Sequence, residues 1–255
     1  MLTLAGKSAI VTGAASGIGA GTAEVFAELG ADLVLVDRDA VPLAAVAERL
    51  AARGGRVVAC PGDVVDPATA ARAVGTALER HGKLDALFNN AGVMTSGDFR
   101  EWDPVRWDGL MDVNLRGIYL FCRAAVPPML AAGGGAIVNT SSVMAFLTEP
   151  GYEAYTTSKA GIVGLTKALA VSYAAQGLRV NCIQPGWIDT PMNQRLAEEL
   201  GGVEALAPVI ARQQPLPRMI STREVGNLVA FLVSDLALAV TGAAIPIDGA
   251  ASAAI

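Results

Sequence analysis

The sequence predicts a doubly wound, parallel α/β sheet in a single domain spanning residues 1–255. Apolar, β-rich runs alternate with longer helical stretches along the whole chain. The expected strands are near-continuous apolar runs, which is typical of strands covered by helices on both faces. A length of 255 residues suits one large α/β domain, and no repeat, low-complexity tract or linker divides the chain.

The first half of the chain alternates regularly. "KSAIVT" reads as a strand because it is apolar and rich in β-branched residues, and the following helical pattern ends at Gly30. By the same criteria we expect further strands at 32–37, 56–63 and 85–90. The expected helices between these strands lie at 17–30, 40–55 and about 67–81.

The second half continues the alternation, with one interruption. We expect helices at about 104–132, from near Tyr155 to Gly177, and at about 222–234, with strands at 135–142, 179–186 and 243–248. The segment "TPMNQRLAEELGGVEALAPVIARQQPLPRMIS" is helical but flanked by prolines. It predicts a small helical insertion at about 190–215 that lies over one end of the sheet and borders a substrate.

The turn after the first strand, "TGAASGIG", has the composition of a phosphate-binding turn. Gly13, Gly17 and Gly19 stand between a strand and a helix, where glycine permits a tight turn and close approach of a pyrophosphate to the helix N-terminus. Their GxxxGxG spacing is a weak signal alone. Asp37 closes the second strand eighteen residues after Gly19, where a carboxylate can bind an adenosine ribose; it could also simply begin the next turn.

Asp37 also bears on which dinucleotide is bound. A carboxylate beside the 2′-position repels a 2′-phosphate and favours NAD over NADP. Arg38 could oppose this by pairing with that phosphate. We give the carboxylate more weight, because an unpaired carboxylate against a phosphate is strongly unfavourable, and expect NAD as cofactor.

The stretch "YTTSK" places Tyr155 and Lys159 about one helical turn apart, so the two side chains share a helix face. Alone, this is equally well explained as a surface pair without a role. His81 is the single histidine, which excludes HExxH metal sites and disfavours a Ser-His-Asp triad. Acid–base chemistry near neutral pH would therefore need another group.

Charge and cysteine usage narrow the function classes. The net charge of −5 argues against nucleic-acid and anionic-membrane partners, and no apolar run is long enough to cross a bilayer. The first residues lack the features of a signal peptide, so a cytoplasmic location is expected. Cys60, Cys122 and Cys182 are widely spaced and include no CxxC pair, which predicts buried free thiols and no metal site.

Six motifs occur in order: "TGAASGIG", "NNAG" at 89–92, Asn114, "SS" at 141–142, "YTTSK" and "PGWIDTP". Together they resemble the short-chain dehydrogenase/reductase family in its short, single-domain branch, over essentially the whole chain. The resemblance implies a catalytic tetrad of Asn114, Ser142, Tyr155 and Lys159. Ser142 precedes Tyr155 by thirteen residues, as the family usually has it.

The turn, the second strand and the resemblance together give the expected cofactor-binding residues. They are Gly13, Ser16, Gly17, Ile18, Gly19, Asp37, Arg38, Asp63, Val64, Asn90, Ala91, Gly92, Thr140, Tyr155, Lys159, Pro185, Gly186, Ile188 and Thr190. The one departure noted is Ala250, in "IDGAAS", where the family commonly has a second glycine. It affects a terminal turn and not the chemistry.

The tetrad implies hydride transfer with a tyrosine acid/base. An ammonium near Tyr155 is expected to lower its pKa, Ser142 to bind the substrate oxygen, and Lys159 also to bind the nicotinamide ribose. By family analogy, Asn114 holds a water that links Lys159 to solvent. Candidate substrate contacts are Met94, Met144, Glu149, Tyr152, Trp187 and Met192, each also explained by packing; Arg195 and Arg212 could meet an anion, but solvated helix faces are the better interpretation.

The favoured function is an NAD-dependent oxidoreductase for a secondary alcohol or ketone, possibly a sugar or polyol. The alternatives are an NADP-linked ketone or 3-oxoacyl thioester reductase, an NAD-sensing module without turnover, and an epimerase or dehydratase on the same fold. The family relation also implies a homotetramer, through the helix of Tyr155 and its neighbour. The sequence does not identify the substrate, the physiological direction or the pathway.

Overall fold

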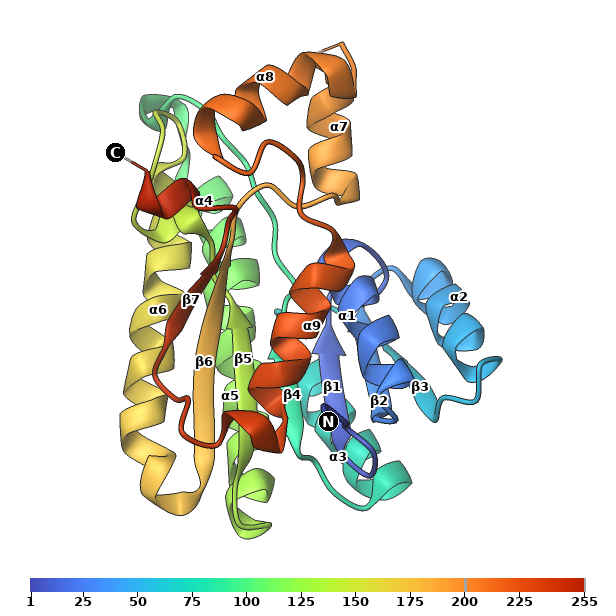
Figure 1. The fold of residues 1–255 in the computed structure, drawn as a ribbon. Helices are drawn as coiled ribbons and strands as arrows, with labels where there is room; N and C mark the ends of the chain where they lie inside the picture. Colours follow the sequence, from blue (N-terminus) through green and yellow to red (C-terminus); the bar gives the residue numbers. More distant parts are fainter. Residues whose placement is uncertain (200, 255) are drawn as a thin grey trace.

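The protein forms one seven-stranded parallel sheet in the computed structural model, which describes residues 1–199 and 201–254 (Figure 1). The strand order is β3-β2-β1-β4-β5-β6-β7, so the chain winds outward in both directions from β1 and β4. The strands are β1 (Ser8–Thr12), β2 (Asp32–Asp37), β3 (Val57–Pro61), β4 (Ala86–Asn89), β5 (Gly135–Thr140), β6 (Leu178–Pro185) and β7 (Ala244–Ile247). Such a switch in strand order leaves a crevice at the carboxyl ends of the strands, where ligands of this fold class bind.

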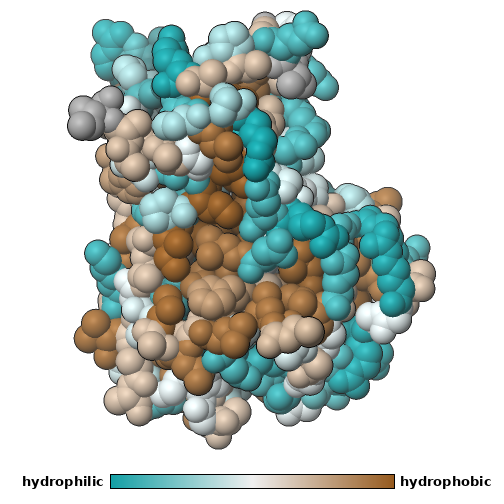
Figure 2. Space-filling view, viewed as in Figure 1, coloured by the Kyte–Doolittle hydropathy of each residue, from teal (hydrophilic) through white to brown (hydrophobic). Residues whose placement is uncertain are grey.

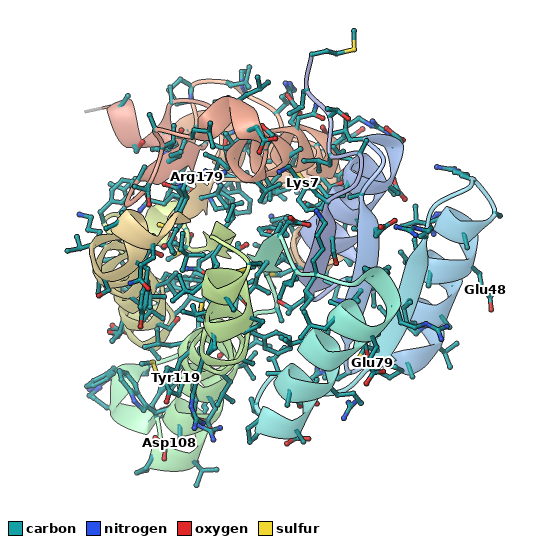
Figure 3. The ribbon with its side chains drawn as sticks, turned by 90° about the horizontal axis from the view of Figure 1, so that it is seen from below. Lys7, Glu48, Glu79, Asp108, Tyr119 and Arg179 are labelled. Atoms are coloured by element: carbon teal, nitrogen blue, oxygen red, sulfur yellow. The ribbon has the colours of Figure 1, made fainter. Side chains whose placement is uncertain are left out.

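Helices cover both faces of the sheet, as the apolar strands require. One apolar cluster joins the sheet to α1 (Gly17–Glu28), α2 (Ala40–Ala51) and α9 (Thr222–Val233). The other joins it to α3 (Pro67–His81), α5 (Gly117–Ala131) and α6 (Glu153–Tyr173). The view along the amino edge of the sheet shows α3 and α5 on one side and α9 on the other (Figure 3). The predicted doubly wound fold is confirmed.

The helix predicted at about 104–132 is interrupted. It consists of α4 (Pro104–Met111), a π-helical turn at Asp112–Arg116 and α5. In the π turn the N–H of Gly117 donates to the carbonyl of Asp112, five residues back. The extra residue in this turn carries Asn114 inward, where it is fully buried.

The predicted insertion forms two helices, α7 (Pro191–Glu199) and α8 (Val203–Gln213), above the carboxyl ends of the strands (Figure 1). They have a small apolar cluster of their own, formed by Ala197, Leu206 and Ile210 with Trp187 packed against it. Residue 200, within the predicted insertion, and residue 255, the end of the predicted domain, lie outside the described residues. Among those described, no helix is both long and apolar enough to cross a membrane.

Candidate active site

The four residues predicted as a tetrad converge at the carboxyl ends of β4 and β5. Ser142 follows β5 and starts a short 3-10 turn, with its Oγ accepting from the N–H of Met144 at 3.1 Å. Tyr155 and Lys159 share one face of α6, and the Lys159 ammonium lies 5.5 Å from the centroid of the Tyr155 ring. Lys159 Nζ donates to the carbonyl of Thr140 at 2.9 Å, so the lysine reaches past the tyrosine to the end of β5.

The electrostatics of the pair differ from the prediction. Burial raises the pKa of Tyr155 to about 12. A hydrogen bond with the Ser142 side chain has a smaller, opposite effect and lowers this pKa. Burial also lowers the pKa of Lys159 from 10.5 to about 8. The Tyr155 pKa is therefore not lowered for the protein's own groups, because desolvation outweighs the stabilisation that the Lys159 ammonium gives a phenolate. At neutral pH the phenol keeps its proton and the lysine is charged.

Asn114 is held by three hydrogen bonds. Its Oδ1 accepts from the N–H of Val93 at 2.8 Å, and its Nδ2 donates to the carbonyl of Val93 at 2.9 Å and to Ser158 Oγ at 3.1 Å. A Cβ built on Gly92 would lie 3.3 Å from Asn114 Oδ1 and 3.5 Å from Lys159 Nζ. The asparagine thus ties the end of β4 to α6, close to the lysine.

The glycine-rich turn has the geometry that the sequence predicted. Gly13 and Gly17 have φ of +67° and +54°, in the left-handed region that glycine favours. A Cβ on Gly19 would lie 2.0 Å from the carbonyl oxygen of Gly13, so this position tolerates only glycine as α1 packs against the turn. Asn90 braces the turn, since its Nδ2 donates to the carbonyl of Thr12 at 3.1 Å.

The start of α1 fits a pyrophosphate. Ser16 is its N-cap residue but makes no side-chain capping bond within the described chain, which leaves its hydroxyl for a ligand. The first intrahelical N–H is that of Ala20, which donates to the carbonyl of Ser16, so the N–H groups of Gly17, Ile18 and Gly19 precede the hydrogen-bonded turns. A helix start of this kind binds anions through its N–H groups and dipole.

Asp37 lies beside this turn at the end of β2. Its Oδ2 accepts from the N–H of Ala15 at 3.0 Å and its Oδ1 from the N–H of Asp39 at 3.1 Å. The carboxylate is half-buried, and the neighbouring Arg38 is exposed. The structure thus brings Asp37 to the glycine-rich turn, as its sequence position implied.

The other predicted cofactor residues line the same edge of the sheet. After β3, Asp63 is half-buried and Val64 is buried, and after β4, Ala91 is half-buried and Gly92 exposed. Thr140 ends β5, and its buried Oγ1 has no hydrogen-bond partner among the described residues. Pro185 ends β6, and the loop after it supplies Gly186, Ile188 and Thr190.

The loop after β6 reaches the glycine-rich turn. A Cβ built on Gly17 would lie 3.4 Å from Thr190 Cγ2, so Thr190 stands over the start of α1. Four groups follow one edge of the sheet. They are the uncapped start of α1, Thr190 facing it, the Asp37 carboxylate at the end of β2 and the unpartnered Thr140 hydroxyl at the end of β5. This set of groups fits an extended nicotinamide dinucleotide.

The predicted substrate residues divide into two groups. Glu149 and Trp187 are joined through Gln213, whose Nε2 donates to Glu149 Oε1 and whose Oε1 accepts from Trp187 Nε1 at 2.9 Å. Tyr152 is the N-cap residue of α6, three positions before Tyr155, and Met144 lies in the 3-10 turn that Ser142 caps. No described contact joins Met94 or Met192 to these residues; Met94 is half-buried and Met192 is exposed.

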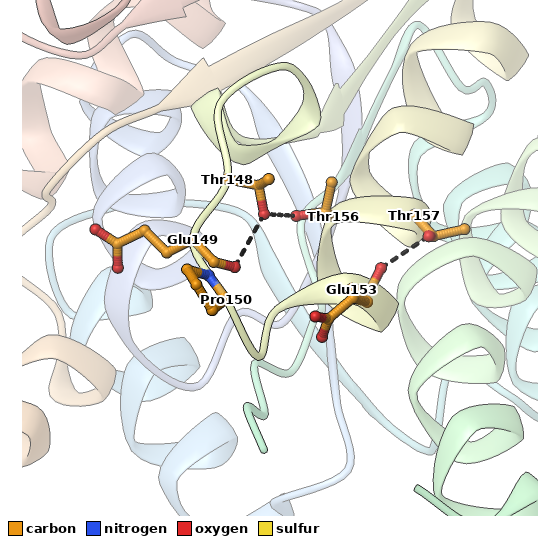
Figure 4. A pocket seen from close by; sticks show the side chains of 6 residues that line it. All are labelled: Thr148, Glu149, Pro150, Glu153, Thr156 and Thr157. Atoms are coloured by element: carbon orange, nitrogen blue, oxygen red, sulfur yellow. Dashed lines mark hydrogen bonds between the residues drawn. The ribbon is translucent and has the colours of Figure 1, made fainter. Parts of the chain in front are cut away.

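The loop between Ser142 and Tyr155 is pinned to α6 beside a surface pocket. Thr148 and Thr156 share a hydrogen bond of 2.8 Å between their hydroxyls, and Thr157 Oγ1 donates to the carbonyl of Glu153 at 2.7 Å (Figure 4). Pro150 separates Glu149 from Glu153, and their side chains point to different sides of it in Figure 4. Among the described residues, no cluster of histidine, cysteine, aspartate or glutamate could hold a metal ion.

Sequence reasoning missed three positioning residues. Thr12 Oγ1 accepts from the N–H groups of Asn90 and Ala91 at 2.9 and 3.1 Å. Buried Gln214 accepts from the N–H of Trp187 at 3.2 Å, and Gln213 holds the Trp187 side chain. The only signal for the glutamines was a polar pair at the end of a helical pattern, directly before the prolines of "QQPLP".

Comparisons with known proteins agree with this geometry. A family model described as enoyl-(acyl carrier protein) reductase matches residues 13–251. The chain is 42% identical over 249 residues to oxidoreductase UcpA of Escherichia coli (strain K12), covering 96% of this chain and 94% of that protein. It is 38% identical over 244 residues to cis-4-hydroxycyclohexanecarboxylate dehydrogenase of Sinomonas cyclohexanicum, covering 95% of each.

A solved structure matches equally fully. L-sorbose reductase from Gluconobacter frateurii, complexed with NADPH and L-sorbose, superposes with a TM-score of 0.92 at 33% identity and covers 97% of both chains.

Proposed function

The chain belongs to the short-chain dehydrogenase/reductase family, and from that premise we propose that it transfers a hydride between NAD(H) and a secondary alcohol or ketone. The family assignment makes it an oxidoreductase acting on CH–OH groups and using a nicotinamide cofactor. The observation that carries the finer proposal is the convergence of Ser142, Tyr155 and Lys159 at the carboxyl end of β5.

Tyr155 is the proposed acid and base. Oxidation of an alcohol releases one hydride and one proton, and the bound nicotinamide supplies the hydride acceptor. The Tyr155 hydroxyl exchanges the proton with the substrate oxygen, and Ser142 donates a hydrogen bond to that oxygen as its charge changes. A Tyr155 pKa of about 12 keeps the phenol protonated at neutral pH, which suits it to donate a proton during ketone reduction.

Lys159 and Asn114 support this step. The Lys159 ammonium lies near the Tyr155 ring and stabilises a phenolate more than a phenol, so it acts when Tyr155 has given up its proton. We propose that it also binds the nicotinamide ribose. Asn114 anchors Val93 and Ser158 around the lysine, which supports the proposed relay through a water.

The test is hydride transfer by the purified protein. We expect reduction of NAD⁺ with members of a panel of alcohols, sugars and hydroxy acids, read as NADH absorbance. Tyr155→Phe should lower kcat by several orders of magnitude and leave NAD binding nearly intact. A variant that keeps more than about a tenth of the wild-type rate would exclude Tyr155 as the proton donor and acceptor.

NAD is the proposed cofactor because the Asp37 carboxylate stands beside the glycine-rich turn. The second candidate is an NADP-linked ketone reductase. Two observations favour it: the matched L-sorbose reductase is complexed with NADPH, and exposed Arg38 follows Asp37 directly. Comparing kcat/KM for the two cofactors decides between these candidates.

Cyclic alcohols and polyols are the proposed substrate class. One relative is named for cis-4-hydroxycyclohexanecarboxylate, and one matched structure is a reductase complexed with L-sorbose. Both ligands are hydroxylated molecules of six or seven carbons. The loop after Ser142 carries both apolar and polar side chains, among them Met144, Tyr152 and Glu149. This combination supports a substrate with an apolar ring that carries a polar group.

A homotetramer is the proposed assembly. Large apolar side chains are exposed on the outer helices, with Val105, Tyr119 and Val171 on α4, α5 and α6. Figure 2 shows a further apolar area over α9 and the open edge strand β7. Phe231 on α9 and Leu236 and Leu238 just after it are also exposed. A second copy covering each surface would produce two-fold axes. Light scattering should give four times the chain mass of 26.1 kDa, and a stable monomer at micromolar concentration would contradict this.

The proposed location is the cytoplasm. Cys60, Cys122 and Cys182 are all free and buried, which fits a reducing compartment.

A further inference from the structure

Two loops at the carboxyl ends of β5 and β6 are joined to α8 by the side chain of Gln213. Glu149 belongs to the loop between the catalytic residues Ser142 and Tyr155, and Trp187 follows Gly186 in the loop after β6. Gln213 ends α8 and contacts both, donating to Glu149 and accepting from Trp187. We call Glu149, Gln213 and Trp187 the Gln213 bridge.

The chemistry of the partners fixes how the bridge is built. The indole N–H of Trp187 can only donate, and an ionised Glu149 carboxylate can only accept. The amide of Gln213 therefore has one favourable orientation, with its oxygen toward the indole and its NH₂ toward the carboxylate. This arrangement ties the Glu149 side chain to the end of α8 and, through Gln213, to Trp187, although Glu149 itself is exposed.

The held carboxylate has an unused acceptor. Gln213 uses Glu149 Oε1, and no described residue donates to Oε2. A hydroxyl or amide of a ligand in this position could donate to that oxygen, whereas a ligand carboxylate would meet a like charge.

No described lysine or arginine forms an ion pair with Glu149. Arg218 is paired with Glu224, and Arg100 with Asp98. Arg106 lies over the Trp102 ring, 4.2 Å from its centroid. Arg195 and Arg212 are exposed on α7 and α8, and neither forms an ion pair with another described residue.

We propose that the Glu149 carboxylate, held by Gln213 beside the substrate-binding loop, selects neutral hydroxylated substrates over anionic ones. This inference rests on the proposed alcohol oxidoreductase function and defines its substrate class. Gln213 is a positioning residue in it: it acts through Glu149. With this selection, the protein would differ in the charge of its substrate from the relative that is named for a hydroxylated ring carrying a carboxylate.

The experiment uses two ligands of the same shape. The probes are cis-4-hydroxycyclohexanecarboxylate and its carboxamide, which differ by one charge. Calorimetry on the protein saturated with NAD⁺ measures the dissociation constant of each probe, and NADH formation measures kcat/KM. Turnover of the carboxamide tests the proposed function, whereas the ratio of the two dissociation constants tests the selection. The two can therefore fail separately.

We expect the wild type to bind the carboxamide roughly three- to tenfold more tightly, as expected for one unit charge at a partly solvated position. Glu149→Gln should bring this ratio close to one, and added salt should reduce it in the wild type by screening. Gln213→Met, which keeps the length but removes both hydrogen bonds, should reduce the ratio by freeing Glu149. A merely structural role for Gln213 would leave the salt dependence unchanged.

Glu153→Gln is the matched control. It removes the same charge four residues further along, at the start of α6 and on the other side of Pro150, and should leave the ratio unchanged. A ratio that moves equally in Glu149→Gln and Glu153→Gln would reflect net charge alone and would overturn the proposal. Tighter binding of the carboxylate by the wild type, lost in Arg212→Ala, would overturn it as well, because Arg212 would then be the residue that meets the substrate.

Discussion

Replacement of Asp37 should change the preference between NAD and NADP. Its two oxygens each accept one backbone N–H, from Ala15 and Asp39. Each carboxylate oxygen has a second lone pair, so the group can still accept from two ribose hydroxyls while it supports the turn. The same lone pairs would face the phosphate of NADP.

The size of the preference follows from these bonds. A hydrogen bond to a charged group contributes about 1.5–3 kcal/mol net, and a 2′-phosphate would lose that bond and be repelled as well. The combined difference should exceed roughly 3 kcal/mol, a preference for NAD of more than a hundredfold in kcat/KM. Asp37→Asn keeps an acceptor oxygen and the shape of the side chain but removes its charge. The ratio of kcat/KM with NAD to kcat/KM with NADP should therefore fall about tenfold in this variant.

The assay is kcat/KM with each cofactor at one alcohol, with the thermal midpoint measured for every variant because Asp37 also holds Ala15. Asp37→Ser should lower activity with NAD and raise it with NADP, and Arg38→Ala in that background should remove the gain. Asp39→Asn is the control, since this neighbouring carboxylate is exposed and makes no capping bond within the described chain. Equal use of both cofactors by the wild type would refute the reasoning, because Asp37 would then not contact the ribose.

Three further predictions concern stability. Lys159→Met should raise the thermal midpoint at pH 7, although we expect it to impair catalysis. Burial lowers the folded pKa of Lys159 from 10.5 to about 8, so its charge destabilises the fold by up to about 3 kcal/mol below pH 8. The gain in midpoint should therefore shrink toward pH 10. The pKa of His81 is lowered from 6.5, mainly by burial. The stability that is present above pH 6.5 should therefore fall as the pH drops through the folded pKa. His81→Gln should flatten this part of the plot of urea midpoint against pH. Ala250 has φ of +71°, and Ala250→Gly should raise the midpoint by up to about 2–4 °C, whereas Ala251→Gly should lower it. Each argument has one contradicting result. These results are a lower midpoint for Lys159→Met at pH 7, an unchanged pH profile for His81→Gln, and a lower midpoint for Ala250→Gly.

The strands, the helices and the phosphate-binding turn could be predicted because their signals are local. An apolar run that is buried on both faces has the same pattern wherever it lies, and Gly13, Gly17 and Gly19 are needed by the path of the turn itself. The order of the tetrad motifs also predicted that Asn114, Ser142, Tyr155 and Lys159 form one site. Sequence alone also noted Ala250 as a departure, but only the structure gives its left-handed backbone.

The interruption of the helix at Asp112–Arg116 was beyond sequence reasoning, because its cause is not local. The residue pattern is helical throughout 104–132, but Asn114 bonds both backbone groups of Val93, twenty-one positions earlier, and reaches Ser158 on α6. Gln213 was missed for the same reason. Its partners Glu149 and Trp187 are sixty-four and twenty-six positions away, and only the packing of α8 against two loops brings them together.

The Tyr155–Lys159 pair shows most clearly what spacing can and cannot predict. Four residues on a helix place both side chains on one face, and they are found there. Spacing does not give the depth of the site, and depth decides the charges: burial raises the tyrosine pKa and lowers that of the lysine, so each group is moved toward its neutral form. The ammonium remains charged at neutral pH with the carbonyl of Thr140 as its described partner. A fold selected only for stability would not keep such a group, so the buried charge is best explained by what it does for the phenolate beside it.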